Sequence, residues 1–140
     1  MSKQKKSLEA ITRSPKDIHV LLVDDEQDQT EVLQRSLVRL GYQVTVHNDP
    51  LKALKSFKPG RFDIAIIDIR MPVMNGFQLL KRLKKIDINL RACLLTAFEL
   101  IEEDMASNQI APNSIECYMK KPIHISEFTK KVTSMLEDTR

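Results

Sequence analysis

The chain has 140 residues, of which 42% are apolar and 29% are charged, as is ordinary for one globular domain. Its formal net charge is +3, but residues 1–17 carry five bases and two acids, so residues 18–140 are neutral and the basic excess gives little support for nucleic-acid binding. No stretch approaches the roughly 20 apolar residues of a membrane span, and no apolar segment of a secretory signal follows the basic start.

Residues 1–17 are polar and lack hydrophobic periodicity, so we expect a disordered or loosely packed basic tail. Its lysines could form a contact segment, although a solvated tail is the simpler interpretation. The remaining residues, 18–140, are expected to form one domain. Cys93 and Cys117 fall inside predicted strands, and we interpret them as reduced core thiols of a cytoplasmic protein.

Five short apolar segments alternate with segments of helical periodicity, which is typical of βα units. Strands are expected at residues 18–24, 42–47, 62–67, 91–95 and 115–119. The first and third are continuously apolar, as in strands that are buried on both faces, whereas the second alternates and is expected nearer an edge. The pattern predicts an α/β fold with a parallel sheet between two layers of helices.

Caps and breakers mark the expected helices. In the first helix, Asp28 is expected as the N-cap and Gly41 as the stop, and the apolar residues 32, 33, 37 and 40 recur at helical spacing. Asp49 followed by Pro50 opens a second helix, and the breakers in residues 69–76 precede a third. A fourth helix is expected near residue 99, with poorly marked boundaries, and a fifth near Ser126.

Reactive side chains follow the strands at their carboxyl ends. Asp24 and Asp25 follow the first strand, Asp68 the third, Thr96 the fourth and Lys121 the fifth, so a parallel sheet would bring them together at one edge. Three carboxylates at one place would repel each other unless they share a cation, and oxygen ligands suit Mg²⁺. A carboxylate beside that cation can attack a phosphoryl group and form an acyl phosphate, with the ammonium and hydroxyl stabilising the charge.

Four segments resemble the receiver domain of two-component response regulators. They are LVDDE at residues 22–26, IDIRMPVMNG at residues 67–76, TAF at residues 96–98 and KP at residues 121–122. The resemblance extends over about residues 18–138. It implies a flavodoxin-like, doubly wound (β/α)5 fold with a five-stranded parallel sheet in the strand order 2-1-3-4-5.

The resemblance also implies roles for single residues. Asp68 would be the phosphoacceptor. Asp24 or Asp25, with Asp68 and the backbone carbonyl of Arg70, would hold Mg²⁺ (or Mn²⁺), and Asp25 is the preferred direct ligand among the two acids.

Thr96 would donate a hydrogen bond to a phosphoryl oxygen, and Lys121 would pair with the phosphate. Tyr118 matches the aromatic residue that changes rotamer together with the threonine in this family. The Lys121–Pro122 bond is expected to be cis.

The function implied is Mg²⁺-dependent phosphoryl transfer from a histidine kinase or phosphotransfer protein to Asp68, which switches a surface that binds an unknown downstream protein. Such a regulator has weak autophosphatase activity and is not a conventional enzyme. We expect no membrane and no direct nucleic-acid binding by this chain, while a homodimer through helix four, strand five and helix five is an arrangement the family allows. Because the chain ends at the last helix, we expect a single-domain regulator or a fragment of a longer one.

Two features depart from the family pattern. Residues 110–114 replace a Gly-Ala-like turn, and the interval from Thr96 to Lys121 is longer than usual, which predicts a shorter or distorted fourth helix. Arg70 and Phe98, two residues after the phosphoacceptor and the threonine, are neither acids nor amides that would position an attacking water, so we expect slow self-dephosphorylation.

Other functions fit less well. An aspartate-nucleophile hydrolase would need a second acid where Arg70 stands, and a flavodoxin-type electron carrier would need a phosphate loop in place of the acidic residues 24–28. A degenerate receiver that acts as a phosphorylation-independent interaction module remains the alternative. Glu26 and Asp28 are interpreted as capping or solvated residues, and the three histidines are too scattered for a metal or phosphohistidine role.

Overall fold

The structure is a computed structural model that describes residues 14–97, 102–111 and 114–137. Five strands form one sheet: β1 His19–Val23, β2 Gln43–His47, β3 Ile64–Asp68, β4 Arg91–Thr96 and β5 Cys117–Lys120. The other elements are the 3-10 turn η1 Pro15–Asp17 and the helices α2 Gln27–Arg39, α3 Pro50–Ser56, α4 Gly76–Ile86, α5 Glu102–Ser107 and α6 Ile125–Glu137.

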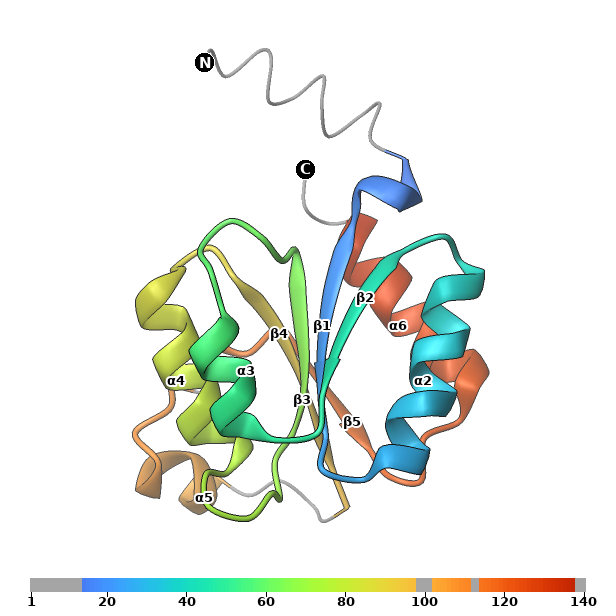
Figure 1. Cartoon of the computed structure of the whole chain (residues 1–140). Coiled ribbons are helices and arrows are strands. Elements are labelled where there is room, and N and C mark those ends of the chain that lie inside the picture. The colour runs from blue at the N-terminus through green and yellow to red at the C-terminus, as the bar shows by residue number, and fades with distance from the viewer. Residues whose placement is uncertain (1–13, 98–101, 112–113, 138–140) are drawn as a thin grey trace.

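All neighbouring strands are parallel, in the order β2-β1-β3-β4-β5, which confirms the predicted sheet. Helices cover both faces: α3, α4 and α5 lie on one side, and α2 and α6 on the other (Figure 1). Because all five strands are parallel, their carboxyl ends lie at the same edge of the sheet.

The core consists of two apolar layers, one on each face of the sheet. Leu21 and Val23 of β1 belong to the layer under α3, α4 and α5, whereas Val20 and Leu22 belong to the layer under α2 and α6. This division follows from the alternation of side chains along a strand. The four residues are at most 1% exposed, and β2, with mostly half-buried residues, lies at the edge as predicted.

The first helix differs from its prediction. α2 begins at Gln27 after the cap position Glu26, so Asp28 lies in the first turn and is not the N-cap. Of the four apolar residues that recur at helical spacing, Leu33 and Leu37 are buried. Residue 32 of α2 is 46% exposed, and residue 40, which is the C-cap that follows the helix, is 38% exposed.

Other helix starts follow the predicted signals. The Asp49 carboxylate accepts from the Leu51 amide at 2.9 Å, as an N-cap does, and Pro50 is the first residue of α3. Asn75 and Gln78 form a capping box at the start of α4. The last helix begins at Ile125, close to the expected Ser126.

Parts of the predicted N-terminal tail and of the predicted fourth helix lie outside the described residues. Residues 15–17 of the predicted tail form η1, where the Lys16 carbonyl accepts from the Gln43 side chain at 2.8 Å, and residues 1–13 lie outside the described residues. The start expected for the fourth helix near residue 99 also lies outside them, as does Phe98. Within the described residues, no helix is long and apolar enough to cross a membrane.

The interpretation of the cysteines as reduced thiols is wrong for this structure. Cys93 of β4 and Cys117 of β5 are direct register partners, with 4.3 Å between their Cα atoms, and their sulfurs form a disulfide. Both strands had been predicted, but pairing follows only from the register between them, which single-strand patterns do not determine.

Candidate functional site

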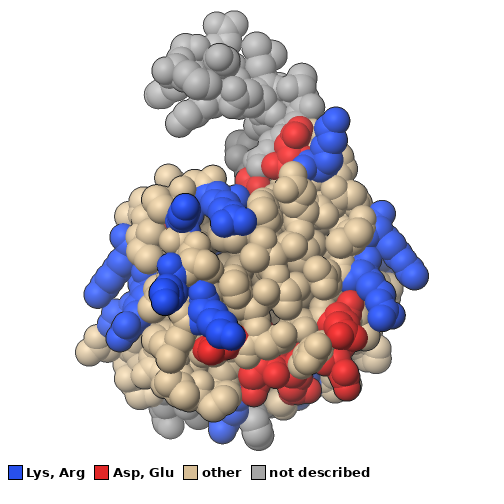
Figure 2. All heavy atoms as spheres, viewed as in Figure 1, with Lys and Arg blue, Asp and Glu red and all other residues tan. Residues whose placement is uncertain are grey.

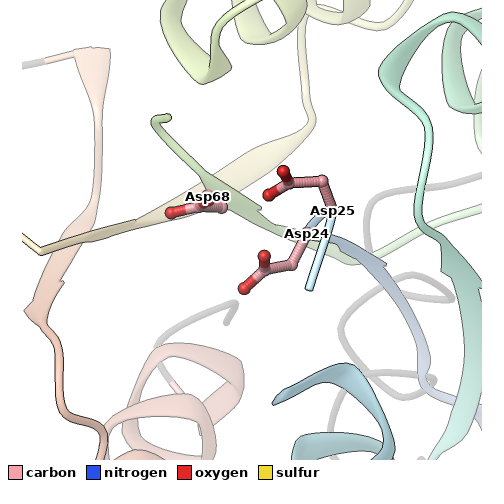
Figure 3. Close-up of side chains that lie close together, drawn as sticks. All are labelled: Asp24, Asp25 and Asp68. Carbon is pink, nitrogen blue, oxygen red and sulfur yellow. The ribbon is translucent and has the colours of Figure 1, made fainter. Parts of the chain in front are cut away.

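Three aspartates meet at the carboxyl ends of two adjacent strands. Asp24 and Asp25 follow β1, and Asp68 is the last residue of β3 (Figure 3). Their carboxylate oxygens lie within 4.8 Å of one another. The register pairs Val23 with Ile67, so the next residues, Asp24 and Asp68, stand side by side, as the sequence predicted. Asp24 and Asp68 are buried, and Asp25 is exposed.

Hydrogen bonds hold Asp24 in place. Its carboxylate accepts from the Glu26 amide at 3.0 Å, and its amide donates to the His47 carbonyl at 3.2 Å. The Asn48 side-chain amide donates to the Asp24 carbonyl at 2.7 Å and to the Thr30 hydroxyl at 3.1 Å. Asn48 comes from the loop after the edge strand β2, and no motif in the sequence had pointed to it.

The loop after Asp68 packs closely against the start of α4. The Ile69 amide donates to the Leu95 carbonyl at 2.9 Å, and the Gly76 amide donates to the Ile69 carbonyl at 2.8 Å. A Cβ atom on Gly76 would lie 2.8 Å from the Ile69 Cα and still closer to the Asp68 carbonyl oxygen. Glycine is required here because of space, and its absent side chain lets α4 begin directly beside the Asp68 backbone.

Lys121 brings a positive charge to the acids. Its ammonium lies 3.0 Å from Asp24 Oδ2, 3.4 Å from Asp68 Oδ1 and 3.3 Å from Glu26 Oε1. The Lys121–Pro122 peptide bond is cis, as expected. Glu26 was interpreted as a capping or solvated residue; it occupies the cap position of α2, but its side chain makes no cap hydrogen bond and is an ion-pair partner of Lys121.

The environment shifts the pKa values of the buried groups. Burial raises the pKa of Asp24. Burial, followed by the charge of Asp24, raises the pKa of Asp68 to about 6, although Lys121 opposes this. Burial alone would lower the pKa of Lys121, but Asp24, Asp68 and Glu26 outweigh burial and raise it. At Asp24 and Asp68 the effect of burial thus outweighs the stabilisation by Lys121, so a further cation beside these two acids would favour their ionised forms.

Thr96 and Tyr118 occupy neighbouring strands near this edge. Thr96 is the last residue of β4 and is buried. Tyr118 pairs in register with Leu94, two residues before Thr96, so both side chains belong to the face covered by α3, α4 and α5. The Tyr118 hydroxyl is a half-buried group 3.6 Å from Met105 Sδ, and burial and then Glu116 raise its pKa.

Arg70 lies two residues after Asp68 in the same loop, with an exposed side chain. Its backbone carbonyl is the fourth group that the sequence assigned to a metal. The three carboxylates that the structure brings together are hard oxygen ligands, as the Arg70 carbonyl would also be, and such ligands fit Mg²⁺ or Mn²⁺ and do not fit a soft metal.

Comparisons with known proteins agree with this geometry. Residues 20–133 match the family described as "Response regulator receiver domain". The transcriptional regulatory protein YkoG of Bacillus subtilis, itself uncharacterised, is 30% identical over 118 residues, which are 84% of this chain and 50% of YkoG. The chain thus spans about half the length of the curated relatives it matches.

Solved structures of receiver domains resemble the whole described fold. The non-phosphorylated HemR receiver domain from Leptospira biflexa is 27% identical with a TM-score of 0.78, over 88% of this chain and 97% of that chain. The response regulator TrrA from Thermotoga maritima, solved with Mg²⁺–BeF, is 28% identical with a TM-score of 0.71, over 84% and 98%. TrrA has also been solved in complex with the histidine kinase ThkA; that structure matches with 30% identity and a TM-score of 0.71, over 85% and 98%.

Proposed function

This chain belongs to the response regulator receiver domain family of two-component systems, and we propose that its reaction is the transfer of a phosphoryl group from a phosphohistidine to Asp68. The single observation that carries the proposal is the buried Asp68 carboxylate, placed within 4.8 Å of two further carboxylates and 3.4 Å from the Lys121 ammonium. No conventional enzyme activity is proposed beyond this self-modification and a weak autophosphatase reaction.

Asp68 acts as the nucleophile. One of its carboxylate oxygens forms the bond to phosphorus while the phosphorus–nitrogen bond of the phosphohistidine breaks, and the electron pair of that bond stays on the imidazole nitrogen, which then takes a proton. Asp24, Asp25, Asp68 and the Arg70 carbonyl would hold Mg²⁺ or Mn²⁺. The bound ion would neutralise charge on the carboxylates and on the transferring group.

Lys121 and Thr96 would stabilise the negative charge of the phosphoryl group on Asp68. Lys121 already lies between Asp24 and Asp68, so its ammonium is within reach of a phosphoryl group on the Asp68 oxygen. Thr96 ends the neighbouring strand β4, and its hydroxyl would donate to a phosphoryl oxygen. Tyr118 would change its rotamer together with Thr96, because the two side chains lie on the same face of the sheet. This change would extend to β5 and to the surface of α5 and α6.

The proposed partners follow from the same reaction. A histidine kinase or a phosphotransfer protein supplies the phosphoryl group, and TrrA, which has been solved with its kinase ThkA, shows that a relative of this fold forms such a complex. The downstream partner is a protein of unknown identity, reached through α5, β5 and α6, where a homodimer could also form. We propose that this chain passes on its signal without binding nucleic acid directly.

Labelling with acetyl phosphate tests the proposal. With Mg²⁺, intact-mass spectrometry is expected to show a gain of about 80 Da, the mass of one phosphoryl group replacing a proton. Asp68→Ala should abolish the gain, and Asp28→Ala, which removes an exposed acid of α2, should leave it unchanged. Absence of any mass gain in the folded wild-type protein would favour the alternative, a degenerate receiver that acts as a phosphorylation-independent interaction module.

A further inference from the structure

A second polar site lies on the far side of α4 from the sheet. A hollow of about 420 Å³ opens between α4 and the end of α5, and seven of its nine lining residues are polar. The cations Lys81, Arg82 and Lys85 line it from α4, and Ser107, Asn108 and Gln109 line it from the end of α5. We propose that this hollow binds a small anion that carries two or more phosphate charges, such as a polyphosphate or a phosphorylated metabolite.

The charge of helices α3 and α4 is one-sided, whereas α5, whose end forms the other wall of the hollow, begins with the acids Glu102, Glu103 and Asp104. Helices α3 and α4, which pack against each other, carry six bases and no acid: Lys52, Lys55, Lys81, Arg82, Lys84 and Lys85. Figure 2 shows Lys and Arg side chains gathered over these two helices and Asp and Glu side chains at the lower edge of the same view, whereas both charges occur over α2. The surface formed by α3 and α4 therefore carries a net positive charge.

The cations of the hollow lack carboxylate partners. Lys84, which is not in the lining, pairs with Glu116 at 3.3 Å and so is already neutralised. Within the part of the chain that the structure describes, Lys81, Arg82 and Lys85 form no ion pair. Lys81 instead donates to the neutral Gln109 side chain at 2.6 Å. Three positive charges of α4 thus line one side of the hollow, and none of the nine described lining residues is an acid.

An ordinary solvated helix face explains less of this arrangement. Lys85 lies in the last turn of α4, where the helix dipole favours a cation, but Lys81 and Arg82 lie in the middle of the helix, where it does not. Residues three and four apart share a helix face, so Gln78, Lys81, Arg82 and Lys85 form one stripe along the hollow. Like charges on such a stripe repel each other, and a shared anion would relieve that repulsion.

Size and polarity define the class of ligand. A volume of about 420 Å³ is within the range of sites for small molecules, and it exceeds what one carboxylate needs. Only Val73 and Met74 are apolar, which does not suit a lipid chain or an apolar metabolite. The side-chain amides of Gln78 and Gln109 beside the cations can donate further hydrogen bonds to phosphate oxygens, which accept several at once.

An NMR titration tests the site. Pyrophosphate is added to the metal-depleted ¹⁵N-labelled full chain at constant ionic strength, so that binding at the three aspartates through a metal is excluded. We expect saturable shifts for the amides of residues 73–85 and 107–109. The double variant Arg82→Gln/Lys85→Gln, whose two side chains are exposed, should raise the dissociation constant roughly tenfold or more.

The matched control is Lys52→Gln/Lys55→Gln, which removes the same charge from exposed positions of α3 outside the hollow and should change the dissociation constant less than about twofold. An equal loss in both variants would assign the effect to the general field of the face and overturn the proposal. The absence of any saturable shift up to about 10 mM pyrophosphate would also overturn the proposal. Shifts centred on residues 24–26, 68 and 121 would do the same. Tighter binding of a single-stranded oligonucleotide, weakened equally in both variants, would assign the face to nucleic acid and overturn it as well.

Discussion

The Lys121 ammonium lies 3.0 Å from the carboxylate of Asp24, a side chain with 0% exposure. A buried carboxylate without a partner would be costly, so this ion pair compensates the burial of Asp24. The same carboxylate is a proposed ligand of Mg²⁺. Lys121 and a bound metal ion would therefore share one acid, and the lysine would limit how strongly the cation binds.

Removing Lys121 should strengthen metal binding while it weakens phosphoryl transfer. In Lys121→Met, the acids lose a positive charge that lies within 3.4 Å of two of them, so we expect the Mg²⁺ affinity at pH 8 to rise about five- to tenfold in titration calorimetry. Labelling by acetyl phosphate should fall, because the phosphoryl charge loses its ammonium partner. Lys120→Met changes the same charge at an exposed neighbour. A similar rise in affinity in that variant would contradict the role given to Lys121.

The stability of the metal-free protein should decrease as the pH rises from about 4 to about 7. The folded pKa of Asp68, about 6, is above the unfolded value of 3.8, mainly because of burial and then of Asp24, so the folded state binds more protons in this window. Deprotonation of Asp68 then costs roughly 1–3 kcal/mol of the free energy of unfolding. Urea unfolding at several pH values measures this loss, and Mg²⁺ should reverse it at pH 7.

Asp68→Asn is the control for this pH dependence. The amide removes the titration without changing the size of the side chain, so the metal-free variant should be more stable than the wild-type protein at pH 7 and of similar stability near pH 4. A variant that loses stability at pH 7 would mean that Asp68 is already well compensated in the folded state.

Gly76→Ala should be strongly destabilising. The added Cβ would meet backbone atoms of Asp68 and Ile69, which cannot move aside as a flexible side chain would, so we expect a loss of about 2–4 kcal/mol. Gly60→Ala is the matched control: a Cβ there meets no atom within 4 Å, but φ is +77°, so only about 1–2 kcal/mol should be lost. Chemical denaturation compares them, and equal losses would contradict the close packing at Gly76.

The strand ends of this site were predictable from the sequence because the rules involved are local. A continuous apolar run such as residues 64–67 indicates a buried strand, parallel pairing follows from the βα alternation, and the residue after the run must then lie at the shared edge. Asp24, Asp25 and Asp68 came together for this reason. Their side-chain roles remain predictions that the labelling experiment tests.

Contacts across distant parts of the chain could not be predicted in this way. Glu26 faces Lys121 across 95 positions of sequence, and Asn48 supports Asp24 from the loop of an edge strand. Both contacts depend on how a loop turns after its strand, which hydrophobic periodicity does not encode. Cys93 and Cys117 likewise pair because of the register of β4 against β5.

Thiol labelling tests that cysteine pairing directly. Because the structure describes no free cysteine, iodoacetamide under denaturing, non-reducing conditions should add no mass, whereas prior reduction should allow two alkylations. The bond joins residues 24 apart, so reduction should cost about 3 kcal/mol of the free energy of unfolding by loop-closure entropy. Two alkylations without reductant would support the original interpretation of two reduced core thiols.

The acyl phosphate on Asp68 should be long-lived. Hydrolysis requires a water molecule held in line with the phosphorus, and an acid or amide near the site is what orients such a water. Arg70, two residues after Asp68, offers an exposed guanidinium, which can only donate and cannot accept the proton of the attacking water. Arg70→Asn should therefore shorten the lifetime of the acyl phosphate several-fold. Arg39→Asn, which makes the same change of charge at the last residue of α2, should leave that lifetime unchanged. The decay is followed by intact mass after excess acetyl phosphate is removed, and a wild-type half-life of seconds would show that another group already positions the water.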